Sequence, residues 1–195
     1  MNLVVAAFTE TYRTMAETMA TSIKMNSPGE RVKLFKIKKS DKDAHNQKPN
    51  IIKKCFKMGC DRVLWLDCDT IIRKSLSGIW GNGDFSVLYR PQGTADFKFN
   101  SGITMFKNTK AVRTLVKRWG KLVEKHPGRY DQYTLWLAYK KSADSLNFVP
   151  LDVKYNDHRF NEDSVIWHGK GHCRFFKKWK REYAKYESEK RSEKR

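Results

Sequence analysis

The chain has 195 residues, of which 39% are hydrophobic, and this suits one domain with a sizeable core. Its 40 Lys and Arg residues outnumber its 21 Asp and Glu residues, so the net charge is +19 and the pI is near 9.8. A field this positive concentrates anions and favours polyanionic or phosphorylated partners. No signal peptide is evident, and no apolar run approaches the ~20 residues of a membrane span, so a soluble, cytoplasmic protein is expected.

The cysteines do not indicate a disulfide framework. There are four of them in a chain of this length, and no two show the spacing of a zinc-binding pair. A reducing compartment is therefore expected.

Apolar periodicity predicts alternating strands and helices in the first half of the chain. A continuous apolar run predicts a buried strand over residues 2–8, and a second strand follows over 31–37. Between them, apolar residues at four-residue spacing predict a helix over 12–25. A short helix is predicted over 50–59.

The same pattern continues in the second half. A strand containing two aspartates occupies 62–72, and an apolar stripe predicts a helix over 110–125 with Lys and Arg on its other face. A further helix is predicted over 131–140. Additional strands are predicted over 84–90, 102–107, 147–151 and 164–168. This order of elements indicates an α/β fold with helices on both faces of one sheet.

Two carboxylates mark the end of the strand in "RVLWLDCDTII". In an open α/β sheet, ligands bind beyond the carboxyl ends of the strands, which is where Asp67 and Asp69 fall. The ordinary alternative is a polar turn, but two adjacent carboxylates repel each other and a turn does not need them. A divalent cation relieves the repulsion, and oxygen ligands suit Mg²⁺ or Mn²⁺ bound to phosphates.

The pattern "hhhhDxDT", in which h is apolar, resembles two enzyme families. One is the haloacid-dehalogenase-like Mg²⁺-dependent phosphatases, whose motif normally follows the first strand rather than a later one. The other is the nucleotide-sugar glycosyltransferases of the GT-A fold, especially glycosyltransferase family 8. Three more segments occur in that family's order and extend the resemblance to about residue 175: "FNSGITMF" (99–106), "DQYTL" (131–135) and "HGKGHCR" (168–174).

The glycosyltransferase resemblance implies a Rossmann-like GT-A domain with a mixed sheet flanked by helices. It implies transfer of a hexosyl group from a nucleoside-diphosphate sugar, by family default a UDP-sugar, with retention of configuration. Asp67, Asp69 and His168 would bind Mn²⁺ or Mg²⁺, and the imidazole favours Mn²⁺. Asp67 would also contact the ribose. No carboxylate stands out as a base for inversion, although Asp152, Asp157 and Glu162 remain open.

Further residues are assigned by the same resemblance. Ala7, Thr9 and Tyr12 would contact the nucleotide, although Tyr12 equally suits a helix residue of the core. Arg174 occupies the position of the family's diphosphate-binding Lys, and Lys170 is its rival for that role. Gly169 and Gly171 would let the backbone approach the phosphates. A basic residue upstream of the aspartates is expected to reach the donor, and the candidates are Lys48, Lys53 and Lys54.

The sugar pocket would be lined by Asn100, Ser101 and Gly102, with Asp96 accepting a sugar hydroxyl. Asp131 and Gln132 would be the catalytic residues beside the reacting carbon. For Asp131, the alternative is a helix N-cap, which contributes ~1 kcal/mol. The acceptor, a glycan, protein or lipid, is not identified by the sequence.

The basic composition also fits a nucleic-acid-binding protein, with Trp and Tyr as stacking platforms. However, the cations are spread over every element, and no nucleic-acid-binding motif is present, so no specific nucleic acid is expected. We divide the chain into a catalytic domain over 1–175 and a basic helical tail over 176–195. The tail is either a surface for an anionic membrane or a solvated C-terminal helix.

Overall fold

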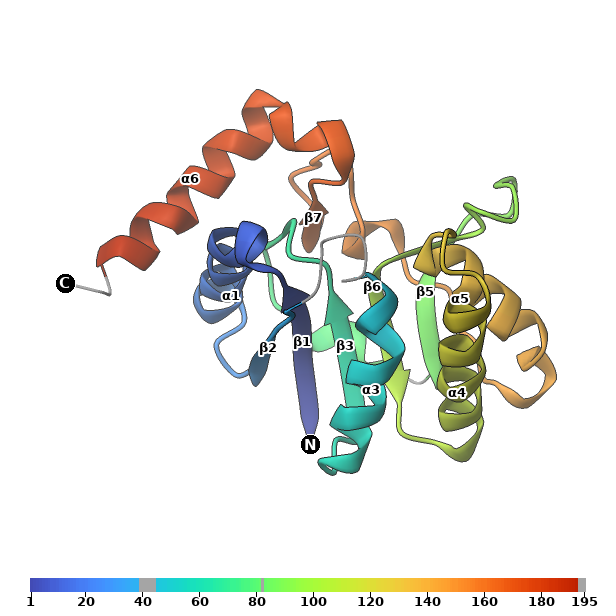
Figure 1. Cartoon of the computed structure of the whole chain (residues 1–195). Coiled ribbons are helices and arrows are strands. Elements are labelled where there is room, and N and C mark those ends of the chain that lie inside the picture. The colour runs from blue at the N-terminus through green and yellow to red at the C-terminus, as the bar shows by residue number, and fades with distance from the viewer. Residues whose placement is uncertain (39–44, 82, 193–195) are drawn as a thin grey trace.

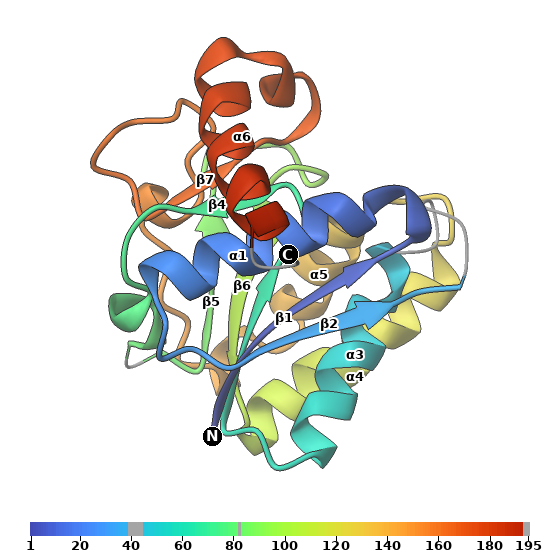
Figure 2. The same ribbon diagram turned by 90° about the vertical axis from the view of Figure 1, so that its left-hand side faces the viewer.

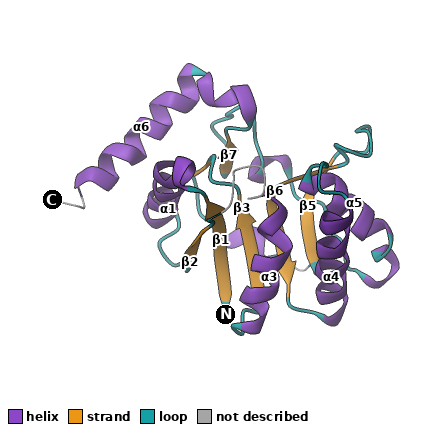
Figure 3. Cartoon of the chain, in the orientation of Figure 1, coloured by secondary structure: helices purple, strands orange, loops and turns teal. Residues whose placement is uncertain are grey.

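The computed structural model describes residues 1–38, 45–81 and 83–192. Its centre is a five-stranded mixed sheet with helices on both faces (Figures 1 and 3). The strands, in spatial order, are β2 (Val32–Lys36), β1 (Asn2–Phe8), β3 (Arg62–Leu66), β6 (Phe99–Lys107) and β5 (Phe85–Tyr89). The first three strands run parallel, and β6 is antiparallel to both β3 and β5.

The alternation of side chains along the strands explains why both faces carry helices. Val4 and Ala6 of β1 belong to the core on one face, whereas Leu3 and Val5 belong to the core on the other. All four are at most 5% exposed. A sheet that is apolar on both faces must be covered on both faces, as the sequence predicted.

Within the described ranges, α-helices cover both faces of the sheet. The first face packs on α1 (Arg13–Asn26). The second packs on α3 (Lys48–Lys57), α4 (Lys110–Lys125) and α5 (Asp131–Lys140). The predicted bounds of α4 and α5 are confirmed. Helix α3 begins two residues earlier than predicted, because Pro49 in its first turn is compatible with a helix start.

The predicted strand over 62–72 is in fact two strands joined by a turn that contains both aspartates. The second piece, β4 (Thr70–Ile72), leaves the main sheet and pairs antiparallel with β7 (Ile166–His168). The predicted strand over 147–151 is wrong. Its backbone runs along the edge of β5 that β6 leaves free and forms only an isolated parallel bridge there, between Phe85 and Phe148.

The C-terminal helix α6 (Lys177–Ser192) lies across α1 (Figure 2). Its apolar residues Trp179 and Tyr186 are 3% and 1% exposed, so this face is packed and not solvated. The Tyr186 hydroxyl accepts a hydrogen bond from Asn26 of α1 at 2.9 Å. Arg73, next to β4, reaches Glu182 of α6 at 3.2 Å. The division of the chain at residue 175 stays a prediction.

Two features bear on the expectations for cysteines and membranes. Cys55, Cys60, Cys68 and Cys173 are all free thiols. Among the described residues, no helix combines the length and the apolar character needed to cross a bilayer.

Replacing Trp179 tests how firmly α6 is attached. We expect Trp179→Ala to lower the free energy of unfolding by about 3–5 kcal/mol, because a large buried ring is lost. Phe175→Ala is the matched control, since Phe175 is 69% exposed, and it should change the value little. Urea unfolding measures both, and equal effects would contradict this packing.

Candidate functional site

A cleft of about 380 Å³ opens at the carboxyl ends of β1 and β3. The chain runs from β1 outward to β2 and then back past β1 to β3, so the strand order reverses at this point. Such reversals are where open α/β sheets bind ligands. The predicted residues that line the cleft are Ala7, Thr9, Tyr12, Asp67, Asp69, Asn100, Ser101, Gly102, Asp131, Gln132, His168, Lys170 and Arg174.

The two aspartates are held by backbone bonds from neighbouring strands. The Asp67 N–H donates to the Gly102 carbonyl at 2.7 Å, and the Gly169 N–H donates to the Asp69 carbonyl at 2.7 Å. The Trp65 indole donates to Asp67 Oδ1 at 2.8 Å. The turn between β3 and β4 is therefore tied both to β6 and to the segment after β7.

His168 completes a group of three side chains that can hold a metal ion. One ligand atom from each of Asp67, Asp69 and His168 lies within 4.8 Å of the other two. The amide oxygen of Asn156 accepts from His168 Nδ1 at 2.9 Å, which assigns the proton of a neutral ring to Nδ1. The lone pair of Nε2 then faces Asp69 Oδ1 at 3.3 Å. Two acceptors so close need a proton or a cation between them.

The electrostatics of Asp69 agree with a cation at this place. Burial opposes its ionisation, but the hydrogen bond and charge of a protonated His168 outweigh burial and lower the pKa of Asp69 to about 2. Asp69 therefore remains a carboxylate at neutral pH. A divalent cation supplies the same positive charge when His168 is neutral.

A glycine makes room for the imidazole. A Cβ built on Gly102 would lie 2.1 Å from Cε1 of His168, so any side chain at this position would displace the ring. The predicted strand began at 102, whereas β6 begins at Phe99. Asn100, Ser101 and Gly102 therefore belong to a strand, which is more rigid than a loop.

The structure selects Lys48 from the three lysines that the sequence left open. Its side chain is 2% exposed, and its ammonium lies 2.9 Å from Asp67 and 2.8 Å from Asp131. Burial opposes this charge, but the two carboxylates outweigh burial and raise the pKa of Lys48 above its ordinary value. Ser101 also donates to Asp131 at 2.7 Å. The N-cap of α5 is Tyr130, so the capping alternative for Asp131 is wrong.

Carboxylates and cations alternate along this part of the cleft. Lys48 pairs with Asp67 and Asp131, whereas Asp69 faces the imidazole of His168. The cationic side chains of Lys170 and Arg174 line the same cleft. The donor set of carboxylates and imidazole suits Mn²⁺ or Mg²⁺, and we conclude that these residues fit such an ion.

The guanidinium of Arg174 and a turn at Gly171 lie on the side of the cleft near β1. The guanidinium of Arg174 lies 5.9 Å from the centre of the Tyr12 ring, and Gly171 has a φ of +58° that favours glycine. The Cys68 thiol donates to the Ala7 carbonyl at 3.1 Å and so ties the turn after β1 to the aspartate turn. Tyr12 is half-buried at the rim rather than a core residue.

Gln132 organises the other side. Its Nε2 donates to the Asp96 carbonyl at 2.7 Å, and its Oε1 accepts from Lys170 at 3.4 Å. Asp96 itself does not line the cleft, because its carboxylate turns to Arg129 at 3.4 Å. The prediction that Asp96 accepts a sugar hydroxyl therefore has no support from its position.

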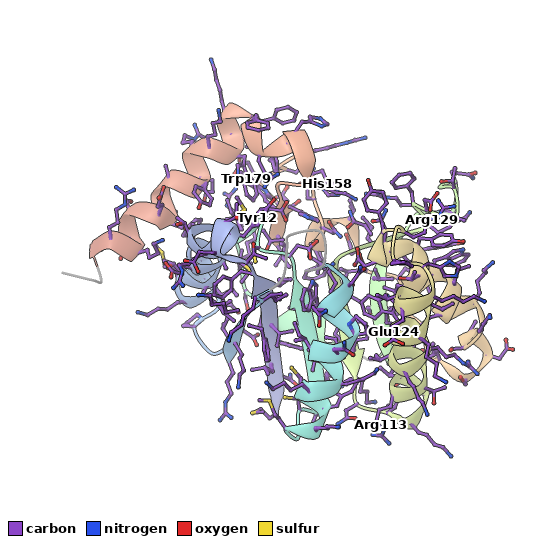
Figure 4. All side chains as sticks on the ribbon, in the orientation of Figure 1. Tyr12, Arg113, Glu124, Arg129, His158 and Trp179 are labelled. Atoms are coloured by element: carbon purple, nitrogen blue, oxygen red, sulfur yellow. The ribbon has the colours of Figure 1, made fainter. Side chains whose placement is uncertain are left out.

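Two residues behind the cleft, the buried Asn156 and the half-buried His158, were missed by the sequence analysis. Asn156 orients His168, and His158 donates from Nδ1 to the His168 carbonyl at 3.1 Å. Asn100 donates to the other ring nitrogen of His158 at 2.9 Å, so His158 links β6 to β7 (Figure 4). Burial lowers the pKa of His158 to about 4, which keeps it neutral. The sequence "NDH" (156–158) does not indicate this role, because the role depends on contacts with residues that are distant in the chain.

The fold matches solved glycosyltransferase structures. A glycosyltransferase involved in glycosylating the major capsid of PBCV-1 has a TM-score of 0.65 at 13% identity, over 98% of each chain. The galactosyltransferase LgtC, solved with donor and acceptor sugar analogues, gives 0.66 at 14% identity, over 97% of this chain and 96% of LgtC. GlyE of Streptococcus pneumoniae TIGR4 gives 0.64 at 17% identity, over 97% of this chain and 63% of GlyE.

No protein-family model matches the sequence, and no curated protein matches it significantly. At identities this low, the structural likeness establishes the fold. The predicted GT-A fold is confirmed.

Changing Gly102 tests the proposed metal ligands. We expect Gly102→Ala to weaken Mn²⁺ binding about tenfold or more, because the added Cβ pushes the His168 ring away. Gly29→Ala is the control, since nothing lies within 4 Å of a Cβ there. Electron paramagnetic resonance measures the concentration of free Mn²⁺ during a titration, and the affinity of each protein follows from it. Unchanged affinity in Gly102→Ala would contradict the assignment.

Removing the buried ammonium tests the charge balance. Lys48→Met leaves the buried carboxylate of Asp131 and the half-buried carboxylate of Asp67 facing each other, so we expect the free energy of unfolding to fall by about 3–5 kcal/mol. Lys57→Met, an exposed position on the same helix, is the control. Urea unfolding in the absence of metal compares the two, and a Lys48→Met protein as stable as the control would refute this role.

Proposed function

We propose that this protein is a metal-dependent glycosyltransferase that moves a hexosyl group from a nucleoside-diphosphate sugar, preferably a UDP-sugar, to an acceptor. The observation that carries the proposal is the group of Asp67, Asp69 and His168 at the carboxyl edge of a GT-A sheet. The fold is shared with glycosyltransferases, one of which was solved with donor and acceptor sugar analogues.

The metal ion supplies Lewis-acid stabilisation of the diphosphate leaving group when it is bound. Asp67, Asp69 and His168 would hold it, and Mn²⁺ suits this mixed set of ligands. Lys170 and Arg174 line the same cleft and can bind the phosphate oxygens. Negative charge that grows on the leaving phosphate is thus met by groups already in place, which need no reorganisation.

The nucleotide would bind along the β1 side of the cleft. Ala7 and Thr9 offer contacts to base and ribose, and the ring of Tyr12 offers a face to the base. Arg174 lies near that ring, so it can reach the adjacent diphosphate.

The donor sugar would bind beyond the metal site. Asn100, Ser101 and Gly102 line this part, and Asp131 stands beside them through its bond from Ser101. Gln132 presents an amide that is fixed at both ends, by the Asp96 carbonyl and by Lys170. Such an amide can stabilise positive charge that develops on the anomeric carbon, and it does not act as a general base.

Retention of configuration is supported by the lack of a suitable base. Among the described residues that line the cleft, the carboxylates are Asp67, Asp69 and Asp131. Asp67 and Asp131 pair with Lys48, and Asp69 faces His168; these five residues form the charge cluster. Asp157, a candidate base in the sequence, accepts bonds from Arg159, Asn161 and Ser164 outside the cleft. Inversion requires a base beside the acceptor hydroxyl.

The haloacid-dehalogenase-like alternative is less well supported. Its motif would follow the first strand, whereas Asp67 follows β3. The structures compared above are glycosyltransferases. Membrane contact by the basic outer face of α6 and a cytoplasmic location stay predictions.

Ligand-dependent stability tests the proposal. At a UDP concentration about 100 times its Kd, we expect the Tm to rise by about 5–10 °C when Mn²⁺ is present, and to change little without it. Asp69→Asn should abolish the shift, and Asp163→Asn, an exposed acid outside the cleft, should preserve it. A shift that ignores Mn²⁺, or phosphatase turnover without nucleotide preference, would contradict the proposal.

A further inference from the structure

Two large aromatic side chains line the cleft and are nevertheless exposed. Phe97 is 45% exposed and Tyr130 is 67% exposed. Both lie on the β6 and α5 side, whereas Tyr12 comes from the turn after β1. In Figure 4, Tyr12 and Arg129 mark these two sides of the upper edge of the sheet. The cleft therefore has an aromatic group at each side, and only one of them is needed for a nucleobase.

The chain neighbours of these aromatic residues are a residue that contacts the proposed catalytic group and a member of that group. Phe97 follows Asp96, whose carbonyl accepts the amide of Gln132 at 2.7 Å. Tyr130 precedes Asp131, whose carboxylate binds Lys48. The two rings thus flank the residues that would hold the donor sugar, on the side away from the nucleotide turn.

The segment that carries Phe97 is folded and tied down. The Gly93 N–H donates to the Arg90 carbonyl at 3.0 Å, and the Phe97 N–H donates to the Thr94 carbonyl at 2.9 Å. The carboxylate of Asp96 pairs with Arg129. This loop projects beyond the sheet next to the start of α5 (Figure 1). Its bonds fix an apolar ring in contact with water, which costs free energy unless a ligand covers the ring.

We propose that Phe97 and Tyr130 form an aromatic platform that binds a carbohydrate acceptor, a proposal that rests on the glycosyltransferase function. A sugar ring has an apolar face of C–H groups, which packs on an aromatic ring, and hydroxyls at its edge, which need polar partners. Lys170 and Gln132 supply those partners beside the platform. An acceptor hydroxyl on this platform lies next to the donor sugar pocket.

The chemistry of the two rings favours a saccharide over a lipid or a peptide. A lipid chain would need a continuous apolar groove, whereas the cleft around Phe97 and Tyr130 is lined by Asp131, Gln132 and Lys170. The aromatic rings of Phe97 and Tyr130 can pack on the apolar faces of a saccharide, and the polar groups between them can bind the hydroxyls at its edges. A peptide or lipid acceptor is the competing outcome of the test.

The test compares transfer with hydrolysis of the donor. UDP-glucose and UDP-galactose are incubated with Mn²⁺ and with lactose, maltose or cellobiose as acceptor probes. In Phe97→Ala and Tyr130→Ala, we expect the ratio of transfer to hydrolysis to fall about tenfold or more, with a raised acceptor KM. Phe175→Ala is the control because Phe175 is exposed but lies outside the cleft, and its ratio should equal that of the unchanged protein.

Saturation-transfer NMR with the same saccharides, UDP and Mg²⁺ measures binding without turnover. We expect saturation transfer from the protein to a saccharide, and we expect this signal to be weaker with Phe97→Ala and with Tyr130→Ala. If no saccharide binds, or if both variants bind and transfer as the unchanged protein does, the platform is refuted while the donor chemistry stands. If UDP neither binds nor any donor is hydrolysed, the proposed function itself fails, and saccharide binding still decides whether the platform exists.

Discussion

A buried ammonium shared by two carboxylates is the interaction on which the cleft depends. Lys48, from the start of α3, bonds Asp67 at the end of β3 and Asp131 at the start of α5. Without it, two carboxylates from different elements would repel each other in a buried setting, at a cost of several kcal/mol. With it, Asp67 keeps its position beside Asp69 and His168. Oxygen atoms of Asp67 and Asp69 and a ring nitrogen of His168 then lie together, where they can hold a divalent cation.

The fold supports this cluster from behind. Gly169 lies against the Trp179 ring of α6, so the packing of the C-terminal helix on α1 also positions the segment that follows His168. Asn156 and His158 attach that segment to the strand that carries the sugar-pocket residues. Helix α6, for which the sequence left open a membrane surface or a solvated tail, thus packs behind the segment that follows His168.

Much of the fold could be predicted, because a strand or helix with a buried face shows a regular spacing of apolar residues in the sequence. The bounds of α4 and α5 are an example, and so are the two aspartates that end an apolar run. Lys48 could not be selected, since three lysines near one another in the chain look alike until burial separates them. Asn156, His158 and the platform of Phe97 and Tyr130 depend on contacts between distant segments, which periodicity does not report.

The central claim is that the charge cluster holds one divalent cation. The most direct measurement is anomalous X-ray scattering from crystals soaked in Mn²⁺ and UDP. We expect a single manganese peak in contact with a carboxylate oxygen of Asp67, a carboxylate oxygen of Asp69 and Nε2 of His168. A cleft that binds UDP with no manganese there, or manganese bound only elsewhere, would contradict it.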